Sequence, residues 1–355
     1  MIPQTKHSIT PDDIKAVVEV LESGPIARGP LVPRFESALA EYCGAKYAVV
    51  FCNGTVALHA ALSAVNATSV ISPPLTFCAI ANATTISGAN LFLTDINGET
   101  LTADFYTGPV RCDETHPVFV PMDYAGLPWI GQCPRNHVLL RDACHSLGAK
   151  IDGVSVTKFA DLAVVSFHPA KVITTSEGGA VLTDDLSTRN LLVRFRDNGR
   201  HDGLQFALGL NYHMPEMCAA LGLSQLKRID ENVSRRRKIA EAYRAHWKLE
   251  TRLTLPPHSE EHAYHLFVIQ LGEGLLCTRA EFRQHLSENG IGTQIHYVPI
   301  YLMPYWSDKF DHSAFPVTNK VYSRILSIPL YPAMTDEEVE TVMRVIDDAL
   351  TKFST

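Results

Sequence analysis

The sequence lacks several features that would mark its class at once. None of its eight cysteines belongs to a Cys-x-x-Cys pair, so we expect reduced, buried thiols. It has no block of like charge, and 38 acidic against 31 basic residues give a formal charge of −7, which argues against a nucleic-acid partner. No apolar run is long enough for a membrane span and the start has no signal-peptide pattern, so we expect a cytoplasmic protein that does not bind membranes.

A metal site is not indicated either. The chain has 15 histidines, and His262-x-x-His265 has a spacing that metal ligands use. No third ligand is evident near this pair. We therefore expect no metal.

What the sequence does have is a series of short apolar runs rich in branched residues, which are typical of buried strands. The alanine-rich stretches 56–64 and 79–87 have the length of crossover helices, which favours a mostly parallel sheet. Only residues 168–178 separate the last two runs, which is short for a crossover, so that pair is expected to be antiparallel. The seven predicted strands are 47–52, 69–72, 91–94, 117–120, 137–140, 161–167 and 179–183.

The second half of the chain has a different organisation, which predicts two domains. We expect an α/β large domain over residues 1–245 and a smaller α+β domain over residues 246–355. Capping and proline signals predict helices over 10–22 and 215–247, with the basic run 235–238 on a solvated face. Further elements are expected at 264–271 (strand), from Thr278 (helix), at 294–297 (strand) and from the capping box Thr335-x-x-Glu338 (helix).

Chemically useful side chains follow several of the predicted strands, at the sheet edge where ligands gather. Asn53-Gly54-Thr55 lies between a strand and a helix start, and its glycine and free amides suit an anion, although a glycine turn with a helix cap is commonly structural. Asp142 ends a buried strand and needs a cation or donors. An ion pair with the adjacent Arg141, capping of the next segment or a protonated ring nitrogen can supply them.

Two more side chains complete this group. Lys171 lies in a short loop beside an apolar strand, where desolvation would lower its pKa and free the amine as nucleophile and base. Phe77 is either a core residue or a platform for a planar ring. No single residue decides the function, but together they offer a phosphate cradle, a ring platform, an anion for a ring nitrogen and a reactive lysine.

These residues stand in motifs through which the sequence resembles the DegT/DnrJ/EryC1/StrS family of pyridoxal-phosphate aminotransferases. The resemblance covers nearly the whole chain and implies the type I fold of pyridoxal-phosphate transferases, with a mostly parallel seven-stranded sheet in the large domain. The matching motifs are Gly29-Pro30-x-Val32-x-x-Phe35-Glu36, Asn53-Gly54-Thr55-x-Ala57-Leu58, Thr76-Phe77, Asp142-Ala143-x-His145-x-x-Gly148, Ser166-Phe167-His168-Pro169-x-Lys171, Thr174-Thr175-x-Glu177-Gly178-Gly179, Asn211-Tyr212-x-Met214 and Ala219-Ala220-Leu221-Gly222.

The resemblance also implies a cofactor, pyridoxal 5'-phosphate, and a role for each motif residue. Lys171 would form the Schiff base with the cofactor, and because dehydratases of the family carry histidine there, it favours transamination. Asn211 would reach the phosphate of the neighbouring subunit, which implies a homodimer with shared active sites. The remaining cofactor-binding residues would be Gly54, Thr55, the Val56 amide and Ser166 at the phosphate, Phe77 on the ring, Asp142 at its nitrogen, and His145.

Within the family, the runs 166–175 and 290–299 are most similar to transaminases of pseudaminic acid biosynthesis. This implies glutamate as amino donor and a UDP-linked 4-keto-6-deoxy-2-acetamido sugar aminated at C4. Arg28, His296 and Tyr297 are candidates for contacting that sugar, with surface or packing roles as the alternative. A dTDP- or GDP-linked sugar, amination at C3, and a cofactor-binding regulator without turnover are the other readings.

Three positions depart from the family pattern. Arg141 stands where an acid is usual, His213 where arginine is common, and Ser176 where glycine is usual. These departures leave the expected cofactor site intact. They bear on the sugar pocket, which the neighbouring residues shape.

Overall fold

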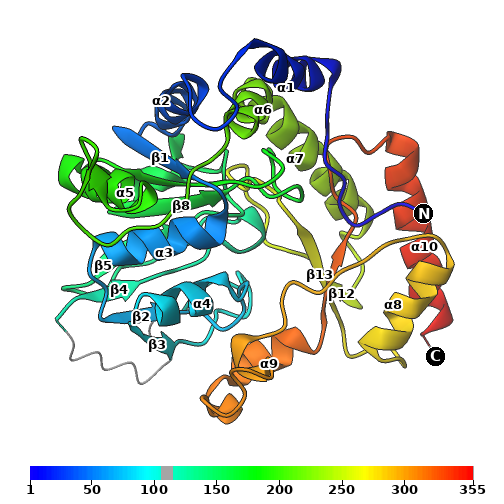
Figure 1. The fold of residues 1–355 in the computed structure, drawn as a ribbon. Coiled ribbons are helices and arrows are strands. Elements are labelled where there is room, and N and C mark those ends of the chain that lie inside the picture. The colour runs from blue at the N-terminus through cyan, green and yellow to red at the C-terminus, as the bar shows by residue number, and fades with distance from the viewer. Residues whose placement is uncertain (105–114, 355) are drawn as a thin grey trace.

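The computed structural model describes residues 1–104 and 115–354, and its centre is a seven-stranded sheet with the order β1-β9-β8-β5-β4-β2-β3 (Figure 1). All seven predicted strands are confirmed to within two residues at each end. Five neighbouring strands, β3, β2, β4, β5 and β8, run parallel, and β9 is antiparallel to both β8 and β1, as the short 168–178 connection predicts. The strands are β1 Tyr47–Phe51, β2 Ser69–Ser72, β3 Asn90–Leu93, β4 Pro117–Phe119, β5 Val138–Asp142, β8 Leu162–Ser166 and β9 Gly179–Thr183.

Both faces of the sheet are covered, because its strands carry apolar side chains in both directions. On one face Val49 and Phe51 join a core with α3 (Gly54–Ala64), α4 (Ala79–Ile86) and α5 (Leu186–Arg196). On the other face Ala48 and Val50 join a core with α2 (Leu31–Cys43) and α6 (Glu216–Leu226), and α1 (Pro11–Ser23) packs on α6. The crossover helices expected from the alanine-rich stretches are α3 and α4.

The C-terminal part of the chain builds its own apolar core around a three-stranded antiparallel sheet, β12-β13-β14 (Figure 1). The helix starts at Thr278 and Thr335 and the capping box at Thr335 are confirmed, and Thr278 forms a second capping box with Glu281. The elements are β12 Leu253–Thr254, β13 Phe267–Leu271, α8 Arg279–Glu288, α9 Pro316–Tyr322, β14 Ile325–Ile328 and α10 Asp336–Lys352. Helix α7 (Ile229–His246) contributes to both this core and the core under α2, so the domain boundary at residue 245 stays a prediction.

Two expected elements differ from the structure. The helix over 215–247 is two helices, because the backbone leaves the helical region at Arg228, whose guanidinium pairs with Asp13 at 2.6 Å. The strand expected over 294–297 is wrong. Only Gln294 forms a bridge, to Ser327, and His296 and Tyr297 line a cavity instead.

The basic run 235–238 was expected on a solvated face, and this is wrong for Arg236. Its side chain is 1% exposed, and it donates to the carbonyls of Tyr264, His265 and Leu330 at 3.0–3.3 Å. The carbonyls satisfy a guanidinium that apolar packing alone would not tolerate. Arg236 thus ties α7 to the segment before β13.

Short hairpins and connections complete the described residues. Strands β6 (Lys150–Ile151) and β7 (Val154–Ser155) form one hairpin, and β10 (Arg200–His201) and β11 (Leu204–Gln205) form another. Seven cysteines are free thiols, of which Cys43 is buried and the others are half-buried; Cys112 lies outside the described residues. Within residues 1–104 and 115–354 no helix has both the length and the apolar character that a membrane crossing requires.

Candidate active site

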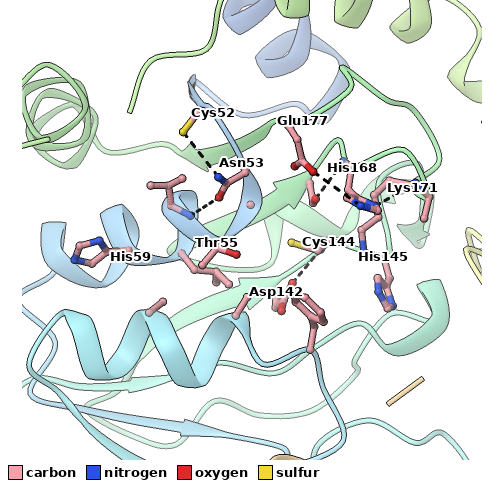
Figure 2. A pocket seen from close by; sticks show the side chains of 18 of the residues that line it. Cys52, Asn53, Thr55, His59, Asp142, Cys144, His145, His168, Lys171 and Glu177 are labelled. Atoms are coloured by element: carbon pink, nitrogen blue, oxygen red, sulfur yellow. Dashed lines mark hydrogen bonds and ion pairs between the residues drawn. The ribbon is translucent and has the colours of Figure 1, made fainter. Parts of the chain in front are cut away.

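A cavity of about 850 Å³ opens at the carboxyl ends of β1, β5 and β8. Figure 2 shows Asn53 and Thr55 at the start of α3 on one side, Lys171 and His168 on the other, and Asp142 with Cys144 between them. The sequence-based site residues that line the cavity are Gly54, Thr55, Val56, Phe77, Asp142, His145, Ser166, Lys171, Asn211, His296 and Tyr297. The structure therefore brings together every predicted site residue except Arg28.

The start of α3 lies at one end of this cavity. Asn53 caps the helix, and its Oδ1 accepts the Val56 N–H at 2.9 Å. The Val56 amide, expected at the phosphate, thus already has an acceptor, whereas the first-turn amides of Gly54 and Thr55 have none within the helix. A Cβ on Gly54 would lie 3.1 Å from the Ser166 Cβ, so the glycine keeps the helix start and the Ser166 hydroxyl close together around one small space. Such a helix end suits a phosphate group.

Asp142 forms the floor of the cavity at the end of β5 and is 6% exposed. Its Oδ1 accepts the Cys144 N–H at 3.1 Å, and among the described residues it has no ion-pair partner within 4.0 Å. The expectation of an ion pair with the adjacent Arg141 is wrong, because Arg141 points to the other face and pairs with Asp123 at 2.6 Å. Burial raises the pKa of Asp142, and the Cys144 hydrogen bonds and the Lys171 charge oppose this rise. A cation or a protonated ring nitrogen could serve as the partner of this carboxylate.

Lys171 lies in the connection between β8 and β9, and its N–H donates to the His168 carbonyl at 2.8 Å. Its side chain reaches the cavity, where burial lowers the pKa of the ammonium group and the charges of Cys144 and Asp142 raise it in part. The lowered pKa increases the fraction of free amine at neutral pH. Free amine is the form that attacks a carbonyl or accepts a proton.

Aromatic and histidine rings form the wall opposite α3. Tyr297 lies with its ring centroid 5.8 Å from that of Phe77, and its hydroxyl is 2.8 Å from His145 Nε2. The His145 ring packs on His265 at 4.2 Å. Burial lowers the pKa of His145, and it lowers that of His296 to about 4. At neutral pH these rings are uncharged, so Lys171 is not surrounded by permanent positive charge.

The remaining sequence candidates lie elsewhere. Arg28 does not line the cavity, and its Nη2 lies 2.7 Å from Asp197 Oδ1 and 2.5 Å from His213 Nε2. His262 stacks on Tyr264 with ring centroids 3.9 Å apart. No group of three or more His, Cys, Asp or Glu side chains suited to a metal occurs in the described part of the chain.

Several lining residues were not assigned to the site from the sequence, although a motif contained Tyr212 and the histidine pair contained His265; they are His59, Met122, Cys144, Tyr212 and His265. His59 was detectable in principle, because it follows Thr55 by four residues and thus shares its face of α3. His59 Nδ1 lies 3.3 Å from the Tyr212 hydroxyl. The other four come from connections whose path only the folded chain reveals.

Comparison with known proteins gives a consistent result. Residues 7–347 match the DegT/DnrJ/EryC1/StrS aminotransferase family. The spore coat polysaccharide biosynthesis protein SpsC of Bacillus subtilis is 33% identical over 98% of this chain and 96% of its own length. The UDP-4-amino-4,6-dideoxy-N-acetyl-beta-L-altrosamine transaminase of Campylobacter jejuni is 30% identical over 99% and 98%.

Among solved structures, the Helicobacter pylori aminotransferase PseC, described as involved in the biosynthesis of pseudoaminic acid, superposes with a TM-score of 0.92. It is 27% identical in sequence, and the match covers 99% of this chain and 100% of that one. The similarity therefore extends over both the sheet and the C-terminal core. The match is not confined to a single motif, because it covers nearly all of the chain that builds the cavity.

Proposed function

The chain belongs to the DegT/DnrJ/EryC1/StrS aminotransferase family, and on that premise we propose that it moves an amino group from glutamate to C4 of a UDP-linked 4-keto-6-deoxy-2-acetamido sugar. The protein is a sugar aminotransferase of the type I fold, and its cofactor is pyridoxal 5'-phosphate. The choice of sugar is supported by the C. jejuni relative and by the H. pylori structure, whose names point to one class of substrate.

The residues around the cavity fit this cofactor. The observation that carries the proposal is that a buried carboxylate, Asp142, and a desolvated lysine, Lys171, face one cavity whose far end is the start of α3. Gly54, Thr55 and Ser166 would hold the phosphate, and Phe77 would lie against the ring. Bound pyridoxal phosphate supplies an electron sink that stabilises negative charge at the carbon losing its proton.

The protein side of the reaction is proton transfer and charge control. Lys171, with its lowered pKa, would move the proton between the donor carbon and the cofactor. Asp142, as a carboxylate, would keep the ring nitrogen protonated. His145 would hold the Tyr297 hydroxyl at the cavity wall through their 2.8 Å contact, where Tyr297 and His296 can contact the sugar.

The active enzyme is proposed to be a homodimer with shared sites. Asn211 lines the cavity of its own chain and follows a stretch, in and just after the β10-β11 hairpin, in which Leu204, Phe206 and Leu208 are 66%, 61% and 83% exposed. Such exposed apolar groups favour a protein partner. If Asn211 serves the neighbouring site, mixed dimers of inactive Lys171→Ala and Asn211→Ala chains should regain activity, because one site then has both residues. Mixed dimers as inactive as either parent would contradict shared sites.

The test of the transamination proposal is spectroscopic. Purified protein loaded with pyridoxal phosphate should be yellow, lose that absorbance with glutamate and regain it with the keto sugar. Mass spectrometry of products from UDP-, dTDP- and GDP-linked keto sugars should show amination of the UDP sugar at C4.

Lys171→Ala should abolish both half-reactions, whereas Lys248→Ala, at an exposed lysine outside the cavity, should leave them intact. An active Lys171→Ala enzyme would overturn the proposal. Cofactor binding without a half-reaction with any amino donor would favour a regulator instead.

A further inference from the structure

A fully buried ion pair lies directly behind the cavity floor. Arg141 Nη1 and Asp123 Oδ1 are 2.6 Å apart, and their side chains are 2% and 0% exposed. Asp123 also accepts the Ser146 hydroxyl at 2.6 Å and the Trp129 N–H at 2.8 Å, and Arg141 donates to the Trp129 carbonyl at 3.2 Å. Burying two charges costs so much desolvation free energy that such a pair is weak evidence for stability. Its location behind Asp142 suggests that the pair has a role at the cavity.

The pair connects the chain segments that carry cavity residues. Asp123 follows Met122, which bridges Asp142, and the Asp123 N–H donates to the Asp142 carbonyl at 3.0 Å. Arg141 precedes Asp142 on β5, and strand alternation places the two side chains on opposite faces. Ser146, the third member, follows His145. One buried cluster thus fixes the ends of β4 and β5 and the turn after Asp142.

The charges of the pair also affect the pKa of Asp142. The Asp123 carboxylate adds to the rise in the pKa of Asp142 that burial causes. Arg141 neutralises Asp123, so the pair as a whole contributes little net charge. Burial raises the pKa of Asp123 and the charge of Arg141 opposes this rise, so removing Arg141 favours uptake of a proton by one of the two neighbouring carboxylates, Asp123 or Asp142.

We propose that Asp123 and Arg141 are a positioning pair that keeps Asp142 charged and directed at the ring nitrogen of pyridoxal phosphate. The pair touches neither substrate nor cofactor and acts through Asp142. The inference rests on the proposed function, because it requires Asp142 to be the partner of the ring nitrogen.

The test compares three variants with the wild type: Arg141→Gln, the neutral pair Asp123→Asn/Arg141→Gln, and Arg196→Gln as matched control. Arg196 forms another nearly buried pair, with Glu36 at 2.6 Å and side chains 10% and 14% exposed, and it does not line the cavity. Two quantities are measured on each: the Kd for pyridoxal phosphate, by titrating the apoprotein, and the pH dependence of the visible absorbance of the loaded protein. A thermal melt of each apoprotein reports on folding.

Arg141→Gln should weaken cofactor binding by about tenfold or more and shift the absorbance titration, since one pKa unit at Asp142 corresponds to a factor of ten. The neutral pair should regain most of the affinity, because no uncompensated charge remains. Arg196→Gln should lower the melting temperature without changing the Kd or the titration. If Arg141→Gln fails to fold, the double variant Asp123→Asn/Arg141→Gln tests the inference by itself. Its absorbance should then have the pH dependence of the wild type.

Three results would overturn the inference. One is an Arg141→Gln protein with wild-type affinity and titration and only a lower melting temperature, as in the control. The second is a neutral pair that binds as weakly as the single variant. The third is a neutral pair whose titration is shifted. In each case the wild type still binds the cofactor, so the proposed function stands; a wild type that binds no pyridoxal phosphate would reject both.

Discussion

Replacing Gly179 with alanine would probe how tightly the sheet supports the start of α3. Gly179 opens β9 and is paired with Phe51 on one side and Ser166 on the other. A Cβ there would lie 2.7 Å from the Asn53 carbonyl oxygen and 2.7 Å from the Gly54 nitrogen, whereas ordinary contacts begin near 3.4 Å. These neighbours are backbone atoms that cannot rotate away. The helix start must therefore move by several tenths of an ångström.

Overpacking of this kind costs about 1–3 kcal/mol. If the displaced helix start relieves the strain in the apoprotein and must return when phosphate binds, the Kd for pyridoxal phosphate rises by about 5- to 150-fold. Titration of the apoprotein, followed by visible absorbance, measures this change. Gly274→Ala is the matched control, because its Cβ would come no closer than 3.5 Å to Arg252 Cγ. A folded Gly179→Ala protein with a Kd within about twofold of wild type would refute the reasoning.

Two further predictions concern stability. Ser176 has φ of 70°, where a side chain is strained, so Ser176→Gly should raise the free energy of unfolding in urea by about 1 kcal/mol; a decrease would show that its contacts outweigh the strain. Burial lowers the pKa of His262 to about 3. As the pH falls below about 6.5, the unfolded chain therefore binds a proton at His262 before the folded protein does. The free energy of unfolding should then fall between pH 6.5 and 3, by up to about 1.4 kcal/mol per pH unit from this group, and His262→Gln should show a shallower slope in the same urea series.

The sheet was predictable from the sequence because most of its strands are buried on both faces, the edge strand β3 being the more exposed exception. Strands buried on both faces are continuous apolar runs, and the crossover lengths between them distinguish parallel from antiparallel neighbours. The cofactor side of the cavity was predictable for a related reason. Gly54, Asp142 and Ser166 each stand where a recognisable strand ends, so topology alone brings them to one edge.

The opposite wall was not predictable in the same way. His265 and Tyr212 reach the cavity from connections that carry no periodic signal. Arg236 appears in the sequence as one of four basic residues, and the carbonyls that hold it lie 28 or more positions away along the chain. The sequence indicated the wrong ion-pair partner for Arg141. Asp142 is adjacent in the chain, whereas the true partner, Asp123, is brought near only by the pairing of β4 and β5.

The antiparallel setting of β9 has a consequence for engineering this protein. Ser166 and Gly179 are direct cross-strand partners, so the segment between them leaves and re-enters the sheet at the same edge. Lys171 is carried on that closed segment, but Phe167, Val172 and Ile173 of the same segment are buried in the core with α2, so a redesigned segment has to keep these apolar side chains. The lysine can thus be moved by changing a connection between two strands, whereas Asp142 ends a central strand of the sheet.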